Sequence, residues 1–245
     1  TYAVVAAGIV AAWWVVGHRR ARLAGLVASL AVAFVVVAGF LQLWAGPHVY
    51  DQLQRSRRAV SLATPWRVVL ETLGPVVGFA QTRELISIGA ALLAVVLAVS
   101  LLLVSRPAGA RQADPPVDPG PGPISGVGVV ALWVTGCLAL AYSLAASYSL
   151  PWYDVLVWAA LPAVASGLVD GVALMRLTAL AVAYVPGRVL GMSTRVEDLT
   201  LGLRRGVAPW VVVLLWLVVI GAGVRTVWRR RRGPRPGDRT PSPTR

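Results

Sequence analysis

The sequence predicts an all-α, polytopic membrane protein: a helical bundle of about seven membrane segments, with amphipathic surface helices on its extracytoplasmic side. Composition is the first observation, because 57% of the 245 residues are hydrophobic and only 13% are charged. A soluble domain carries about a quarter charged residues. The mean hydropathy of +0.72 is the second. The third is a series of apolar runs, several of which reach the about 20 residues that a helix needs to cross a bilayer.

Seven apolar runs define the predicted segments in chain order. They cover residues 2–16, 23–44, 85–104, 127–146, 155–165, 172–185 and 207–227. The fifth is short and contains Pro162, so the fifth and sixth are alternatively one bent unit that only partly crosses the bilayer. The first run begins without a preceding basic region, so we expect a processed chain or a fragment of a longer one.

The domain organisation follows from charge and from proline and glycine. Residues 1–228 are predicted to form the membrane domain, interrupted by a flexible, Pro/Gly-rich linker at 105–125. Residues 229–245 are predicted to be a disordered basic tail. Arginines concentrate in the loop at 18–22 and in the tail, which places both, and by segment parity the linker, on the cytoplasmic side of a multi-pass protein of the cell membrane.

The polar stretch after the second segment predicts two surface helices. Asp51, Arg55 and Arg58 share one face of the first helix, over residues 47–61. The second is predicted to begin with Thr64 as its cap and to stop at Gly74 and Pro75, with an apolar side of four residues. Those residues are Trp66, Val69, Leu70 and Leu73.

A third outer helix is predicted before the last membrane segment. Thr194 and Glu197 fit a capping box, and Gly206 is expected to end the helix. Three surface helices on one side of a bundle suggest a roofed cavity.

Two groups of outer residues have chemistry that suits a sugar phosphate. Guanidinium groups such as those of Arg55, Arg58 and Arg67 bind phosphate in a bidentate manner, although attraction to anionic lipid headgroups explains them equally simply. Trp152 and Tyr153 can stack on a sugar ring, or can belong to the aromatic belt found at both membrane interfaces. The carboxylate of Asp154 can accept hydrogen bonds from sugar hydroxyls.

We expect the charged residue of the sixth segment, Arg176, to have a structural role. Arg176 lies about two turns from the cytoplasmic end of that segment and is expected to extend its guanidinium to the membrane surface.

The sequence shows no motif for a nucleotide, metal or cofactor site. No nucleotide-binding motif is present, and His18, His48 and Cys137 are far apart, so we expect no metal site, no cofactor and no nucleic acid.

Short motifs are spread over residues 40–210. They are Gly46-Pro47-His48, Asp51-Gln52-Leu53, Arg57, Ser61-Leu62-Ala63-Thr64-Pro65-Trp66-Arg67, Tyr148-Ser149-Leu150-Pro151-Trp152-Tyr153, Arg176-Leu177-Thr178 and Tyr184-Val185-Pro186-Gly187-Arg188-Val189. Together they resemble the C-terminal half of the polyprenol-phosphate-mannose-dependent α-1,6-mannosyltransferases.

The resemblance implies a GT-C membrane glycosyltransferase, which transfers mannose from a polyprenyl-phosphate donor to a cell-envelope glycan acceptor on the extracytoplasmic face. It implies that Arg55, Arg58, Arg67 and Arg188 face the donor phosphate, and that Asp51 orients Arg55. Trp66 belongs to the same half-site, and Trp152, Tyr153 and Asp154 would shape the sugar or acceptor pocket. The catalytic base of this family lies in an N-terminal outer loop, so we expect it outside this chain.

Two functions of other classes remain open. A non-enzymatic transporter or flippase would handle a similar lipid-linked substrate, but such proteins tend to show repeats and interrupted helices at the bilayer midplane. A structural membrane subunit that recruits partners through its tail would leave the outer arginines without a common pocket.

Overall fold

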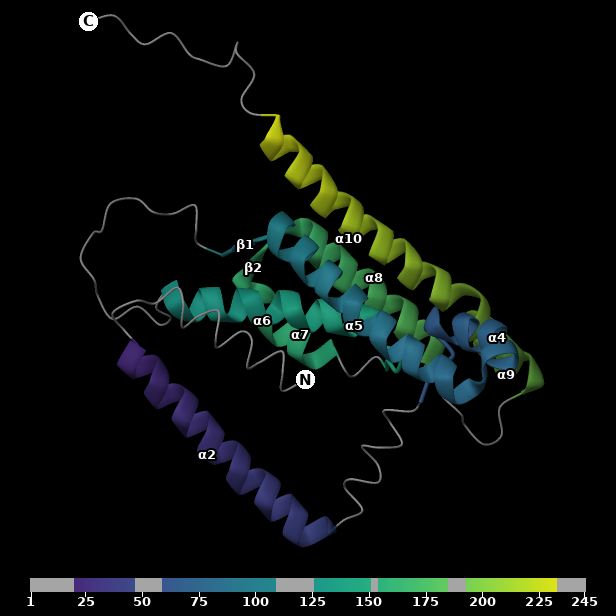
Figure 1. Ribbon diagram of the computed structural model, residues 1–245, viewed down its shortest axis with the longest axis horizontal. Helices are drawn as coiled ribbons and strands as arrows, with labels where there is room; N and C mark the ends of the chain where they lie inside the picture. Colours follow the sequence, from purple (N-terminus) through teal and green to yellow (C-terminus); the bar gives the residue numbers. More distant parts are fainter. Residues whose placement is uncertain (1–19, 47–58, 109–125, 151–153, 185–192, 233–245) are drawn as a thin grey trace, which may run out of the picture.

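The computed structural model describes residues 20–46, 59–108, 126–150, 154–184 and 193–232 (Figure 1). These residues are mainly helical. The helices are α2 (Arg20–Ala45), α4 (Trp66–Val77), α5 (Phe79–Val104), α6 (Gly126–Ala145), α7 (Val155–Ala160), α8 (Gly167–Tyr184), α9 (Thr194–Gly202) and α10 (Ala208–Arg231). A 3-10 turn covers Leu161–Ala163, a π-helical segment covers Leu203–Val207, and the short strands are β1 (Arg106–Pro107) and β2 (Val164–Ala165).

Three helices in the described part of the chain are long and apolar enough to cross a membrane. They are Phe79–Val104, Gly167–Tyr184 and Thr194–Arg231. The prediction of about seven segments is therefore wrong for this part of the chain. Shorter apolar helices occur at Phe34–Trp44 and Val129–Ala145. The predicted fifth segment contains only the six-residue α7, about 9 Å long, because Pro162 lies in the 3-10 turn that follows it.

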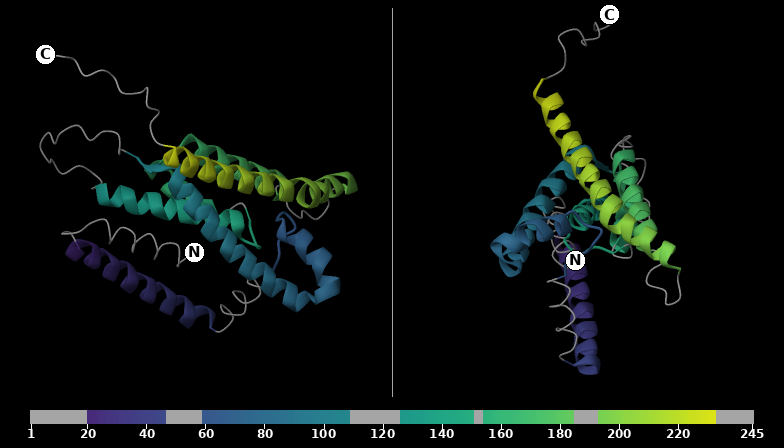
Figure 2. Two further views of the ribbon diagram at one scale, coloured as in Figure 1. Left: turned by 45° about the horizontal axis from the view of Figure 1, so that its top comes forward. Right: turned by 90° about the vertical axis from the view of Figure 1, so that its right-hand side faces the viewer.

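The core lies where α5, α6, α8 and α10 pack together, and α2 stands apart from them in all views (Figures 1 and 2). Leu97, Leu101, Leu140 and Val219 are among the fully buried side chains of this core. Tryptophans add polar links between helices. Trp133 on α6 donates a hydrogen bond to the Ser105 hydroxyl, at 2.9 Å.

Helix α4 folds back on α5 as an antiparallel hairpin. The corner is Gly78, whose φ of +103° is a conformation that favours glycine. Two predictions for α4 are wrong. The helix does not stop at Gly74 and Pro75 but continues to Val77, with Pro75 inside it. Thr64 does not cap it either, since its hydroxyl donates to the carbonyl oxygens of Ser61 and Ser147.

The last predicted surface helix is not separate from the last membrane segment. The α9 helix, the π-helical segment and α10 form one continuous helix of 38 residues. Gly206 therefore does not end a helix but lies within the π-helical winding. The capping box is also absent, because the cap position is Ser193, with no side-chain hydrogen bond.

The beginning of the predicted flexible linker is ordered. Arg106 pairs with Ala165 and Pro107 with Val164 in an antiparallel arrangement. The amide of Ala108 adds a hydrogen bond to the carbonyl oxygen of Ala163, at 2.9 Å. This pairing fixes the end of α5 against the start of α8. The remainder of the linker, from residue 109, lies outside the described residues.

Candidate functional site: a buried polar network

A buried ion pair connects the middle of α8 to the turn after α6. Arg176 on α8 is only 1% exposed, and its guanidinium donates to Asp154 Oδ2. It also donates to the Ser149 hydroxyl and, at 3.0 Å, to the carbonyl oxygen of Ser143. Arg176 therefore does not extend to the membrane surface, contrary to the expectation from its position. A positive charge within an apolar bundle requires such partners, because desolvation without them is costly.

The other partner of the pair, Asp154, lies directly before α7 and outside the three candidate spans. Burial raises the pKa of its carboxyl, whereas attraction to Arg176 lowers it. Two buried polar atoms have no hydrogen-bond partner among the described residues, namely Asp154 Oδ1 and the indole nitrogen of Trp158. They lie at i and i+4, which are neighbouring positions on a helix. The carboxylate oxygen can accept a hydrogen bond and the indole nitrogen can donate one.

Ser61 connects this ion pair to the segment before α4. Its hydroxyl donates to the carbonyl oxygen of Ser149 at 3.2 Å, and its amide donates to the carbonyl oxygen of Ser147 at 2.9 Å. A third hydrogen bond joins the Ser61 hydroxyl to the phenol of Tyr184 at the end of α8. Residues 59–64 and the turn at 146–150 are therefore held against each other by backbone and side-chain hydrogen bonds.

Trp66 extends the same connection into α4. Its indole nitrogen donates to the carbonyl oxygen of Ala145 at 2.7 Å, and its ring lies 5.7 Å from that of Trp216 on α10. Trp216 in turn donates to the carbonyl oxygen of Leu144 at 2.9 Å. Both indoles satisfy carbonyl groups at the end of α6, where the last carbonyls of a helix lack intrahelical donors.

The π-helical segment completes the network from the side of α10. The guanidinium carbon of Arg204 lies 4.7 Å from the centre of the Tyr184 ring, a cation–π geometry. Its Nε donates to the carbonyl oxygen of Ala183 at 2.5 Å. Polar contacts thus run from Asp154 through Arg176, Ser149, Ser61 and Tyr184 to Arg204. They join four parts of the chain that are far apart in sequence.

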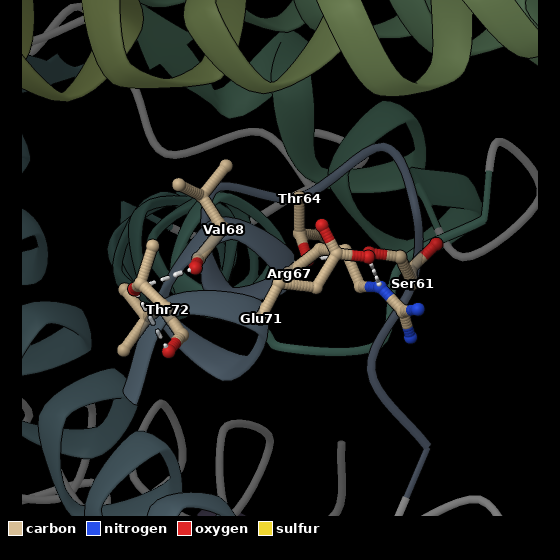
Figure 3. A network of polar contacts seen from close by, with 7 residues as sticks. Ser61, Thr64, Arg67, Val68, Glu71 and Thr72 are labelled. Atoms are coloured by element: carbon tan, nitrogen blue, oxygen red, sulfur yellow. Dashed lines mark hydrogen bonds and ion pairs between the residues drawn. The ribbon is translucent and has the colours of Figure 1, made fainter. Parts of the chain in front are cut away.

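Arg67 lies at the exposed edge of this network (Figure 3). Its Nε binds Glu71 Oε1 at 2.6 Å, one turn further along α4. Half-buried and paired through one nitrogen, the guanidinium keeps its terminal nitrogens toward the Ser61 side of the helix in Figure 3. An exposed i, i+4 pair of this kind contributes little to stability.

The predicted site residues divide into two groups. Trp66, Arg67 and Asp154 are described, and all three lie in or beside the network. The remaining six lie outside the described residues: Asp51, Arg55, Arg58, Trp152, Tyr153 and Arg188. Ser61, Ser149 and Tyr184 belong to the motifs quoted above, but neither they nor Arg204 had a predicted role in the site. Single hydroxyl groups beside apolar runs are common in membrane helices, so their sequence signal is weak.

Comparisons with protein-family models, with curated proteins and with solved structures found no match to this chain. Within the described ranges, no group of three or more His, Cys, Asp or Glu side chains is placed to hold a metal ion. The chemistry available in the described network is therefore that of hydrogen bonds, one buried ion pair and the guanidinium groups at its edge.

Proposed function

We propose that the chain is a membrane glycosyltransferase, or the C-terminal part of one. It transfers mannose from a polyprenyl-phosphate donor to a cell-envelope glycan acceptor on the extracytoplasmic face. The protein is multi-pass in this proposal, and its arginine-rich C-terminal tail is cytoplasmic. The sequence motifs suggest the activity, and one structural observation supports it. The Ser61 hydroxyl donates to the carbonyl oxygen of Ser149 at 3.2 Å, and these two residues belong to the two outer motifs, 61–67 and 148–153, that carry the resemblance.

The roles in this half-site follow from the positions of its residues. Arg67 is the described guanidinium at the edge of the network and would bind the donor phosphate, since guanidinium groups form charge-assisted hydrogen bonds to phosphate. Asp154 is held by Arg176 and is no free ligand through Oδ2, so any contact with an acceptor hydroxyl would use Oδ1. Trp66 is occupied by Ala145 and Trp216, and would support the site rather than contact the sugar.

A transporter or flippase for a lipid-linked substrate is the second candidate. The ion pair of Arg176 and Asp154 favours it, because ionisable groups buried in membrane helices often mark a substrate or ion pathway. The two functions differ in the fate of the mannose. A transferase moves the sugar to an acceptor, whereas a flippase moves the intact lipid to the other leaflet.

The test uses membranes from source cells with the gene intact, deleted or replaced by a variant. Radiolabelled polyprenyl-phosphate mannose and a mannan acceptor are supplied, and label is measured in glycan and in each leaflet. Gene-dependent label in glycan is expected. Gene-dependent movement of intact donor with no labelled glycan would replace the transferase by a flippase.

The Arg67→Gln variant tests the assigned phosphate contact. Loss of one charge-assisted hydrogen bond, about 1.5 kcal/mol, is expected to raise the KM for the donor about tenfold, with a smaller change in kcat. Arg83→Gln, which removes an exposed charge at the start of α5, is the matched control and should leave KM unchanged. Equal donor kinetics for both variants would exclude Arg67 from the phosphate site.

A further inference from the structure

Helix α4 presents three different faces. Leu70 and Gly74 are buried, and the ion pair of Arg67 and Glu71 forms a narrow polar stripe. The remaining face is apolar and exposed, because no other part of the described chain covers it. It is formed by Val68, Thr72, Leu73, Val76 and Val77, and Val76 is 84% exposed. A helix in water would place polar side chains on such a face.

The one hydroxyl group on the apolar face is already satisfied. Thr72 donates to the carbonyl oxygen of Val68 at 2.8 Å, and also lies 3.3 Å from that of Val69 (Figure 3). A hydroxyl bonded to its own helix no longer needs water. The exposed face therefore offers no free side-chain donor to solvent, as is required of a surface in contact with hydrocarbon.

The position of α4 beside α5 sets how far it could extend into a bilayer. The Trp66 ring lies 3.2 Å from the position that a β-carbon on Gly89 would occupy, so the start of α4 is level with the eleventh residue of α5. Helix α5 is one of the three candidate spans. With 12 residues α4 is about 18 Å long, which is too short to cross about 30 Å of hydrocarbon.

We propose that α4 is a re-entrant helix of the bilayer. Its Val68, Thr72 and Val76 face contacts lipid acyl chains, and its Arg67–Glu71 stripe faces a water-accessible space on the side of Ser61. Figure 3 shows Arg67 and Glu71 on the Ser61 side, whereas Val68 and Thr72 lie on the other side. Helix α4 thus forms a wall between the acyl chains and the polar network.

Acyl chains fit this face better than a protein partner because the apolar surface continues along the same hairpin. Leu85, Ile88, Leu92 and Val95 form an exposed apolar stripe on α5, a candidate span. The polar stripe of α4 has to lie away from the chains, since an ion pair exposed to hydrocarbon is strongly unfavourable. This inference does not depend on the enzymatic proposal.

Spin labelling of the protein in lipid nanodiscs tests the proposal. Cys137, the single native cysteine, is buried and is first replaced by alanine. Labels are attached at Val68→Cys and Val76→Cys on the apolar face, and at Glu71→Cys on the polar stripe as the matched control. Val95→Cys on α5 and Arg230→Cys in the last turn of α10 provide the lipid and water references. Collision with oxygen reports hydrocarbon, and collision with a nickel chelate reports water.

Labels at positions 68 and 76 are expected to collide more with oxygen than with the nickel chelate, like the lipid reference at 95. The label at 71 is expected to collide more with the nickel chelate, like the water reference at 230. Nickel accessibility at 68 and 76 equal to that at 71 would overturn the proposal in favour of a solvated surface helix. Low accessibility to both reagents at 68 and 76 would also overturn it, because a protein partner would then cover the face. If one of the two apolar-face variants does not fold, the other retains the comparison.

Discussion

At the scale of single residues, Arg176 has the most demanding environment in the described chain. Its guanidinium is almost fully buried in α8 and has a carboxylate, a hydroxyl and a carbonyl oxygen as partners. A buried pair does not by itself stabilise a protein relative to apolar residues, but removal of one partner leaves an uncompensated charge. The pair therefore determines the position of Asp154 and of the turn at 146–150 relative to α8 more than the stability of the bundle.

We predict that Arg176→Met destabilises the protein by about 3–5 kcal/mol at neutral pH, because Asp154 is left buried without its cation. Burial already raises the pKa of Asp154, and loss of the opposing attraction raises it further. Between about pH 3.9, the pKa of aspartate in the unfolded chain, and the higher pKa of Asp154 in the folded variant, only the folded state holds this proton. Its unfolding free energy is expected to fall as pH rises above about 4, and denaturant unfolding in micelles at several pH values measures this.

The double variant Arg176→Met with Asp154→Asn is the control. Without a carboxyl at position 154, the pH dependence from this group should disappear and part of the stability should return. A single variant as stable as the parent at neutral pH would mean that water, and not Arg176, compensates Asp154.

At the scale of elements, glycines set how closely the helices approach. A β-carbon on Gly223 of α10 would lie 2.8 Å from the β-carbon of Ser100 on α5, closer than such atoms pack. Gly136 of α6 is similarly near Ala160 of α7, at 3.1 Å. Small residues at crossing points are the usual means by which membrane helices pack closely.

Gly223→Ala is predicted to destabilise the contact between α5 and α10 by about 1–3 kcal/mol, through overpacking against Ser100. Gly221→Ala on the same helix is the matched control. A β-carbon there meets nothing within 4 Å, so the change should be neutral or stabilising by up to about 1 kcal/mol. Thermal unfolding in nanodiscs compares the two variants, and Ser100→Gly should partly restore Gly223→Ala. Equal melting temperatures would show that α5 and α10 separate freely.

The apolar runs of the sequence predicted that α5, α6 and α8 are helices, but not where all of these helices begin. Helix α6 begins and ends within one residue of its predicted apolar run. Helix α5 begins six residues earlier than predicted, because Gln81, Arg83 and Glu84 are good helix formers that hydropathy does not count. Helix α8 also begins early, at Gly167, since glycine permits a turn without requiring one.

The contacts of the site were harder to predict than its location. The sequence predicted that residues 47–67 and 150–154 line one pocket, and most of both stretches lies outside the described residues. Within the described part, Ser61 is hydrogen bonded to Ser149, and Ser149 shares Arg176 with Asp154. The sequence did not indicate that Arg176 would pair with Asp154, which is 22 positions away on another element. A single sequence contains periodicity along each helix but no information on which charged residues meet across helices.

At the scale of the whole molecule, the described bundle has two different ends. The α4 and α9 helices lie at one end, with β1, β2 and the last turns of α10 at the other (Figure 1). Arginines gather at the second end in the final turn of α10, as Arg229, Arg230 and Arg231. Arginines also occur at the first end, as Arg67, Arg195, Arg204 and Arg205, so the cytoplasmic side of the second end stays a prediction.

We predict that Arg106→Cys and Arg232→Cys lie on the cytoplasmic side and Arg195→Cys on the opposite side. Each is introduced singly after Cys137 is replaced by alanine, and a membrane-impermeant thiol reagent is applied to intact cells or to inverted vesicles. Labelling of 195 in cells, and of 106 and 232 only in inverted vesicles, is expected. Labelling of 106 and 195 from the same side would contradict a bundle in which α5 and α10 cross the membrane.

The π-helical winding at Leu203–Val207 changes which way side chains point along the longest helix. A π turn closes its hydrogen bonds over five residues rather than four, so it holds one residue more than an α-helical path of equal course. Side chains before the π turn are therefore rotated about the helix axis by about 100°, relative to those after it, compared with an uninterrupted α-helix. Arg204, which lies over the Tyr184 ring, belongs to this winding, and its one surplus residue keeps the two halves of a 38-residue helix out of phase.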